Sequence, residues 1–309
     1  MSTNEKKVSN YFTYPREFVT YRWYKPLIVT ALGAVFYVIL SIVVMGIGYA
    51  IGGREAMQQV MSASGYDGAD MYTATGVFVN MGGVAILLLA LFLASLIVKD
   101  RPFSSYSSSR GGFDFKVFFK CLLIALVVCG TGIVLTTILT NGFHFNNHFT
   151  IGGFILLLIL VPLQCIAEEY IFRGLATQTL GSWIKIPIIA IIVQTIIFTL
   201  GHPYNMIGRI EIFSAGLLMG VMALLTNGLE ASSAIHVVNN LVFFLMYGFG
   251  MTHLTSEADW ASVIATIVID LIYIGILYYL KKKNTFNHIL KDDVTLFNEK
   301  ALAKQNHTT

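Results

Sequence analysis

Long apolar stretches alternate with short polar segments along the chain, and this pattern predicts its elements. A helix that crosses a bilayer needs about 20 predominantly apolar residues. Backbone exposed to lipid must satisfy its own hydrogen bonds, so apolar stretches near this length are expected to be helical. The sequence contains eight of them, at 26–51, 75–98, 117–140, 151–172, 184–202, 210–226, 231–249 and 260–280. The pattern therefore predicts an all-α fold, a polytopic membrane helical bundle with about eight transmembrane helices.

Composition and charge placement support this prediction. Hydrophobic residues make up 56% of the chain and charged residues only 12%, whereas soluble domains carry about 25% charged residues. Lysine and arginine gather before the first apolar stretch, after the second and after the last, while the opposite loops hold Arg54 and Arg209. Basic residues favour the cytoplasmic side. We therefore expect an integral membrane protein with both termini cytoplasmic and no nucleic-acid partner.

Ionisable residues are not spread evenly over the apolar stretches. Each such group near the bilayer centre costs at least about 2.5–3.5 kcal/mol. They are nevertheless concentrated in the apolar stretches between 151 and 249. We accordingly expect three accessory transmembrane helices at 26–148, a catalytic helical core at 149–250 and a final transmembrane helix at 251–283. Cytoplasmic tails are expected at 1–25 and 284–309.

The first polar motif is Glu-Glu-Tyr-Ile-Phe-Arg-Gly at 168–174. Neighbouring helical residues point about 100° apart, so Glu168 and Glu169 face different directions. Glu169 and Arg173 are four residues apart with the acid first, the favourable order for an ion pair. Glu168 has no cation on its own helix face and is a candidate general base. The alternative is an ion-pair cluster that only joins two helices.

Two further motifs each place two polar or aromatic side chains one helical turn apart. Phe198 and His202 share a helix face, and Pro203 is expected to kink or end that helix. His202 on its own could simply cap a helix end at the water interface. His236 and Asn240 also share a face, and a histidine–asparagine pair can donate hydrogen bonds to an oxyanion. The alternative is polar contact between helices.

Counting residues along the helices suggests that these motifs lie at one depth. Glu168 and His202 are equally far from Lys185, near which the chain is expected to reverse. Counting through the next two turns places His236 within about 6 Å of that level, at 1.5 Å per residue. We therefore expect one water-filled polar cavity that holds Glu168, His202, His236 and Asn240.

Taken together and in order, the three motifs resemble the CAAX-prenyl protease and bacteriocin-processing family, also called Abi-type or type II CAAX endopeptidases. The resemblance covers roughly 150–250. It implies an intramembrane endopeptidase of a prokaryotic-type cell membrane. The implied roles are water activation by Glu168 with His202, oxyanion stabilisation by His236 and Asn240, and support from Glu169 and Arg173.

The substrate implied by this resemblance is a membrane-associated or lipidated protein or peptide, with the lipid bilayer as the surroundings. Glu168, His202 and His236 could also form a three-ligand zinc site with one open position. The compact His-Glu-x-x-His pattern is absent, however, and a glutamate mechanism without metal is favoured. Two other functions remain open: a non-catalytic membrane scaffold or bacteriocin-immunity-type protein, and a small-solute or ion transporter.

Overall fold

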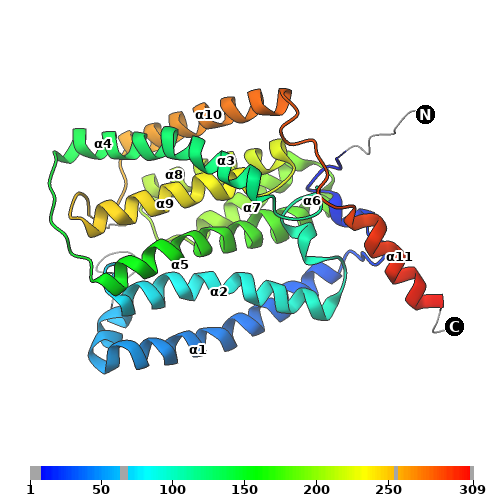
Figure 1. Cartoon of the computed structure of the whole chain (residues 1–309), viewed down its shortest axis with the longest axis horizontal. Coiled ribbons are helices and arrows are strands. Elements are labelled where there is room, and N and C mark those ends of the chain that lie inside the picture. Colours follow the sequence, from blue (N-terminus) through cyan, green and yellow to red (C-terminus); the bar gives the residue numbers. More distant parts are fainter. Residues whose placement is uncertain (1–7, 63–68, 254–256, 307–309) are drawn as a thin grey trace.

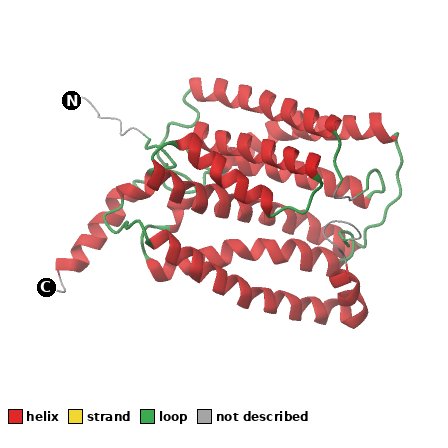
Figure 2. Ribbon diagram, turned by 180° about the vertical axis from the view of Figure 1, so that it is seen from behind, coloured by secondary structure: helices red, strands yellow, loops and turns green. Residues whose placement is uncertain are grey.

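The chain folds into a helical bundle (Figures 1 and 2). The computed structural model describes residues 8–62, 69–253 and 257–306, and this part of the chain contains helices and loops but no named strand. The α-helices are α1 (Lys25–Ser62), α2 (Ala74–Val98), α3 (Phe115–Ala125), α4 (Thr131–Asn141), α5 (Ile151–Glu169), α6 (Gln178–Ile184), α7 (Pro187–Leu200), α8 (Met206–Thr226), α9 (Glu230–Gly248), α10 (Trp260–Lys282) and α11 (Asp293–Asn306). The predicted fold class is confirmed.

Short helices of other types join or extend these elements. The 3₁₀-helices η1 (Tyr14–Glu17) and η2 (Phe103–Tyr106) lie in the segments before α1 and after α2. The π-helix η3 (Leu126–Gly130) connects α3 to α4, and the π-helix η4 (Tyr170–Thr177) connects α5 to α6. The N-terminal tail expected at 1–25 lies partly outside the described residues, and the division of the chain into domains stays a prediction.

Seven helical segments within the described residues are long and apolar enough to cross a membrane. The stretch expected at 184–202 differs, because α7 has only 14 residues. At 1.5 Å per residue α7 spans about 21 Å, less than the roughly 30 Å of a hydrocarbon core. Pro187 starts the helix after an extended Ile186, and Gly201 ends it. The fifth of the eight predicted crossings is therefore a short helix packed against α6 and α8.

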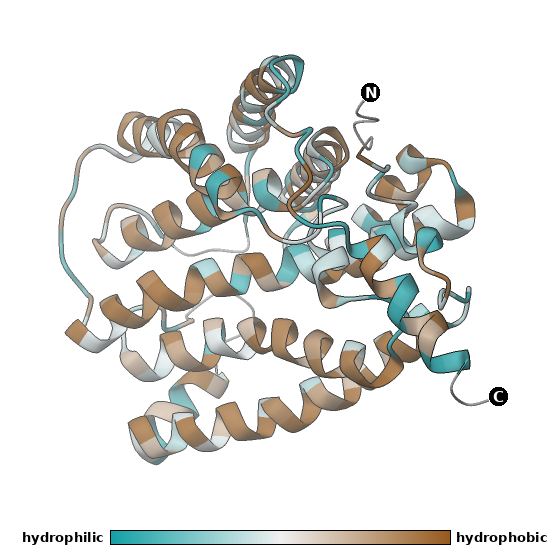
Figure 3. Cartoon of the chain, turned by 45° about the vertical axis from the view of Figure 1, so that its right-hand side comes forward, coloured by the Kyte–Doolittle hydropathy of each residue, from teal (hydrophilic) through white to brown (hydrophobic). Residues whose placement is uncertain are grey.

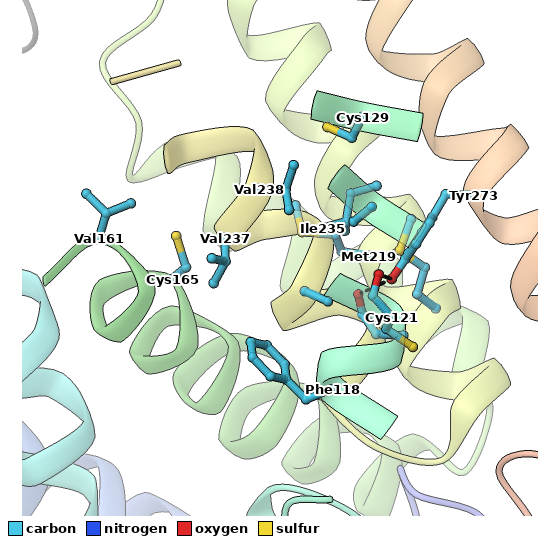
Figure 4. Packing of buried hydrophobic residues seen from close by; sticks show 14 of the residues in the cluster. Phe118, Cys121, Cys129, Val161, Cys165, Met219, Ile235, Val237, Val238 and Tyr273 are labelled. Carbon is cyan, nitrogen blue, oxygen red and sulfur yellow. Dashed lines mark hydrogen bonds between the residues drawn. The ribbon is translucent and has the colours of Figure 1, made fainter. Parts of the chain in front are cut away.

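The centre of the bundle is α9. In its apolar stretch 61% of the residues are buried, against 33% or less in each of the other candidate spans. Around it lie α3, α5 and α8, while α10 packs on α8, and α2 with α1 extends the bundle from α5 (Figure 1). Side chains from α3, α5, α8, α9 and α10 meet in the main core, which includes Phe118, Ile235 and Tyr273 (Figure 4). Apolar residues cover the outer helices (Figure 3), as expected for a lipid-facing surface.

Both ends of the described chain lie at one end of the bundle (Figure 1). The Asn298 side chain of α11 accepts a hydrogen bond from the Val19 backbone N–H at 2.9 Å and donates one to the Glu17 carbonyl at 2.9 Å. These two hydrogen bonds hold the described parts of both tails together at that end. Their cytoplasmic location stays a prediction.

The segment between α2 and α3 is buried at this same end, which sequence analysis did not anticipate. Arg110 and Glu230 form an ion pair at 2.7 Å, and both side chains are fully buried. The other Glu230 oxygen accepts the Asp114 backbone N–H at 2.8 Å. Arg101 lies over the Tyr106 ring at 3.7 Å. These contacts attach the start of α9 to the segment that precedes α3.

Asp114 gives this end of the bundle a pH-dependent contact. Its carboxylate caps α3 through the Lys116 and Val117 N–H groups and contacts His288. Burial pushes the pKa of Asp114 up, but the His288 and backbone hydrogen bonds outweigh it, and the net pKa is lowered. A carboxyl whose pKa is lower in the folded than in the unfolded protein stabilises the fold. This stabilisation is fully present above the pKa of the unfolded state, near 3.9, and it is lost as the pH falls through the pKa of the folded state.

We expect Asp114→Ala to cost about 1 kcal/mol near neutral pH, the usual size of a lost helix cap. The matched control is Asp259→Ala, which removes the cap of α10 at the Ser262 N–H. Thermal unfolding in detergent at pH 7 and below pH 4 measures both. The loss of stability caused by Asp114→Ala should be smaller at the acidic pH than at pH 7. The loss caused by Asp259→Ala should change less between the two pH values. Equal pH dependence of the two variants would contradict the assignment.

Candidate active site

The first motif lies where α5 passes into the π-helix η4. Glu168 and Glu169 form the last turn of α5, and Arg173 and Gly174 lie in η4. The Thr177 hydroxyl donates to the Phe172 carbonyl five residues back, which fits the wider π-type turn. π-Helical segments occur frequently at functional sites. This change of helix type sets the direction in which residues after Glu169 point.

Glu169 and Arg173 form the ion pair that their spacing predicted. Arg173 Nη1 lies 2.8 Å from Glu169 Oε1, and neither side chain is exposed. Arg173 Nη2 donates to the Gly216 carbonyl of α8 at 3.0 Å. The guanidinium also lies over the Phe198 ring of α7, 4.8 Å from its centroid. Arg173 therefore connects η4, α7 and α8 while it neutralises a buried carboxylate.

His236 of α9 contacts both glutamates. Its Nδ1 lies 3.1 Å from Glu169 Oε1, and its Nε2 lies 3.5 Å from Glu168 Oε2. Glu169 Oε1 already accepts from Arg173, so the Nδ1–H donates to that carboxylate. The Cys165 thiol lies 3.5 Å from the His236 backbone carbonyl, and Figure 4 shows Cys165 on α5 facing α9. The histidine ring is thus fixed with its Nε2 directed to Glu168.

Asn240 lies one turn beyond His236 and contacts α5 through a residue that sequence analysis missed. The Asn240 amide donates to the Gln164 side-chain carbonyl at 3.3 Å. Gln164 precedes Glu168 by one helical turn, so both side chains belong to one face of α5. The available signal in the sequence was a glutamine inside an otherwise apolar span. Asn239 is exposed and donates to Asn240 Oδ1 at 3.1 Å.

His202 contacts the end of its own helix in this structure. The residue follows the end of α7, and its Nδ1 lies 2.8 Å from the Phe198 carbonyl. A carbonyl only accepts, so Nδ1 carries the proton and Nε2 keeps its lone pair. Within the described residues, no recorded contact joins the His202 ring to Glu168 or His236. His202 instead packs on the Phe198 ring at 4.5 Å, and that ring lies beneath Arg173. The shared cavity stays a prediction.

The possible zinc ligands do not form a compact donor set in this arrangement. Among the described residues, no three His, Cys, Asp or Glu side chains are grouped as metal ligands. His236 Nδ1 is bonded to Glu169, which leaves only its Nε2, and His202 has no recorded contact with Glu168. Three ligands around one ion are the minimum of a catalytic zinc site. Within the described residues these three side chains are not grouped around one point, and the mechanism without metal stays a prediction.

Comparison with known proteins finds a family that resembles this core. Residues 150–242 match the model of the type II CAAX prenyl endopeptidase Rce1-like family. The uncharacterized protein YyaK of Bacillus subtilis (strain 168) is 24% identical over 218 residues, covering 63% of this chain and 72% of that protein. No solved structure matches the chain. The family resemblance predicted from the three motifs is confirmed.

The matched segment contains all of the motif residues. It runs from the start of α5 to the middle of α9 and includes the Glu168, His202 and His236 positions. The family supports CAAX-type intramembrane protease activity in general, in an integral membrane protein of helical spans. The roles of individual residues and the substrate are matters of proposal.

Proposed function

We propose that this chain is an intramembrane endopeptidase that hydrolyses a peptide bond of a membrane-associated or lipidated protein or peptide. The observation that carries the proposal is the contact of His236 with Glu168 and Glu169 on a buried helix face. A structural ion pair needs only Glu169 and Arg173, which already neutralise each other. Glu168 adds a second carboxylate inside the membrane. Its insertion costs free energy, and a purely structural role does not require it.

Glu168 serves as the base in this proposal. A water held by its carboxylate gives one proton to Glu168 while the water oxygen attacks the carbonyl carbon of the scissile bond. The protonated Glu168 then transfers that proton to the leaving amine nitrogen as the carbon–nitrogen bond breaks. General acid–base catalysis of this kind contributes about 10²–10⁴-fold to a rate.

With protons on both ring nitrogens, His236 donates to Glu169 and attracts Glu168, and so positions Glu168. Asn240 stabilises the oxyanion. Glu169 holds the His236 ring through Nδ1, so Nε2 stays directed at Glu168 Oε2. The Asn240 amide has two N–H groups, and only one is used by Gln164. The second is a donor for the oxygen of the tetrahedral intermediate, a role typically worth about 10²–10³-fold. His236 therefore acts as a positioning residue rather than as the oxyanion donor expected from the sequence.

His202 is the second partner of the attacking water in this proposal. Its Nε2 lone pair is unused, and its Nδ1–H is fixed by the Phe198 carbonyl. In the proposed reaction this nitrogen accepts a hydrogen bond from the water at Glu168. The glutamate mechanism needs no metal, because side chains of this chain supply its proton transfers and hydrogen bonds.

The proposal is tested by comparing peptide termini in cells. Membrane proteins from cells that produce native protein, Glu168→Gln or Glu211→Gln are digested, and new termini are identified by mass spectrometry. Glu211 is the matched control, a membrane glutamate of α8 that accepts from Thr266 at 2.8 Å. Termini that disappear with Glu168→Gln and remain with Glu211→Gln support the protease. Identical termini from all three proteins, at equal abundance, contradict it and favour a scaffold.

A further inference from the structure

A second candidate site lies at the end of the bundle where both ends of the described chain are found. It is beside the last turns of α8 and α10. A cavity of about 560 Å³ is present there. Helix α8 ends at Thr226 and α10 at Lys282, so the cavity lies at the level where these spans meet water. It shares no residue with the candidate active site. Its lining residues are Val8, Ser9, Asn10, Leu224, Asn227 and Lys281.

The charge of this cavity comes from Lys281. Three consecutive lysines lie at the C-terminal end of α10, and the ammonium groups of two of them lie over aromatic rings. Lys282 Nζ lies 4.6 Å from the Tyr278 ring centroid, and Lys283 Nζ lies 5.7 Å from that of Tyr279. Lys281 is half-buried in the cavity wall, and no ion pair or hydrogen bond is recorded for it within the described residues. Among the described lining residues, Lys281 is therefore the charged one.

Neutral donors and apolar groups complete the wall. The Asn10 side-chain carbonyl accepts from the Phe12 N–H at 3.0 Å, so its amide N–H groups remain available as donors. Asn227 ends α8 in the left-handed region at φ 56°, and its side chain has no recorded partner in the described chain. Leu224 supplies an apolar surface one turn earlier on α8. A cation, amide donors and an apolar floor suit an anion that is attached to a hydrocarbon chain.

We propose that this cavity binds the headgroup of an anionic phospholipid. The phosphate would lie at Lys281, with the amides of Asn10 and Asn227 as further donors, and an acyl chain would follow Leu224 toward the membrane. Basic pockets between transmembrane helices bind anionic headgroups in this way. A free phosphate ion shares the charge but is far smaller than a cavity in the size range of organic ligand sites.

Lipid binding to purified protein tests the proposal. Native protein and the variants Lys281→Gln, Lys282→Gln and Asn227→Gly are purified in a neutral detergent. Thermal unfolding is measured with phosphatidylglycerol, with phosphatidylcholine and with inorganic phosphate, and bound lipid is counted by native mass spectrometry. Lys282→Gln removes the same charge from the adjacent position. Asn227→Gly removes only the amide, because glycine adopts positive φ freely.

Phosphatidylglycerol should stabilise native protein and Lys282→Gln equally, and phosphatidylcholine should not. Lys281→Gln should bind phosphatidylglycerol about fivefold more weakly, the effect of one basic residue at a membrane surface. Asn227→Gly should also weaken binding. If Lys281→Gln and Lys282→Gln weakened phosphatidylglycerol binding equally, general surface charge would explain the binding. The proposed headgroup site would then be contradicted. The same stabilisation by inorganic phosphate without lipid would also overturn the lipid assignment.

Discussion

Replacing Arg173 by alanine is expected to destabilise the protein by about 3–5 kcal/mol, the usual result of removing one partner from a buried ion pair. Glu169 would remain fully buried without its cation. The Gly216 carbonyl would lose its donor, and Phe198 would lose the guanidinium that lies over its ring. Unfolding in detergent, followed by heat and by denaturant, measures the change.

Two comparisons separate this pairing from a general loss of packing. Glu168→Gln should unfold close to the native temperature, because Glu168 forms no ion pair with a cation of its own helix. Arg173→Met combined with Glu169→Gln should recover part of the loss, since neither partner is then left as an isolated charge. If Arg173→Ala and Glu168→Gln proved equally stable, the ion pair would contribute nothing measurable. If the double variant were less stable than Arg173→Ala alone, the buried charge would not be the cause.

The sequence was informative wherever a feature depended on one helix at a time. Apolar length predicted the long spans, and a period of 3.6 residues predicted that Glu169 and Arg173 would meet. The same period separated Glu168 from Glu169, and they do contact His236 through different ring nitrogens. These relations follow from local geometry and need no knowledge of how helices cross.

Relations between helices were less predictable. Counting residues assumed straight α-helices, but η4 is a π-helix, and α7 stops after Leu200. The rotation of α9 about its axis decides whether His236 faces the glutamates or an oxyanion, and no sequence period specifies it. Gln164 was overlooked for the same reason, because its partner Asn240 belongs to another helix. The buried Arg110–Glu230 pair joins a loop to a helix end, which hydropathy alone does not reveal.

Replacing Glu168 by glutamine should lower the rate of peptide cleavage by about 10²–10⁴-fold, the contribution of a positioned general base. Glutamine keeps the shape of the side chain but does not take up the proton of the attacking water. The Glu169–Arg173 pair remains, so the variant should fold with its His236 ring still held at Nδ1. The measurement is kcat/KM for a peptide substrate identified from the missing termini. Glu211→Gln, as control, should cleave at the native rate.

A chelator separates the glutamate mechanism from a zinc mechanism in the same assay. Native enzyme should keep its rate with a strong zinc chelator, since Glu168 activates water without a metal in the proposed reaction. Asn240→Ala should lose about 10²–10³-fold in kcat, the usual effect of one oxyanion donor. Its KM should change little, because that hydrogen bond strengthens only in the transition state. Loss of activity with chelator, restored by added zinc, would instead make His202 and His236 metal ligands. Native-level cleavage by Glu168→Gln would remove Glu168 from the reaction altogether.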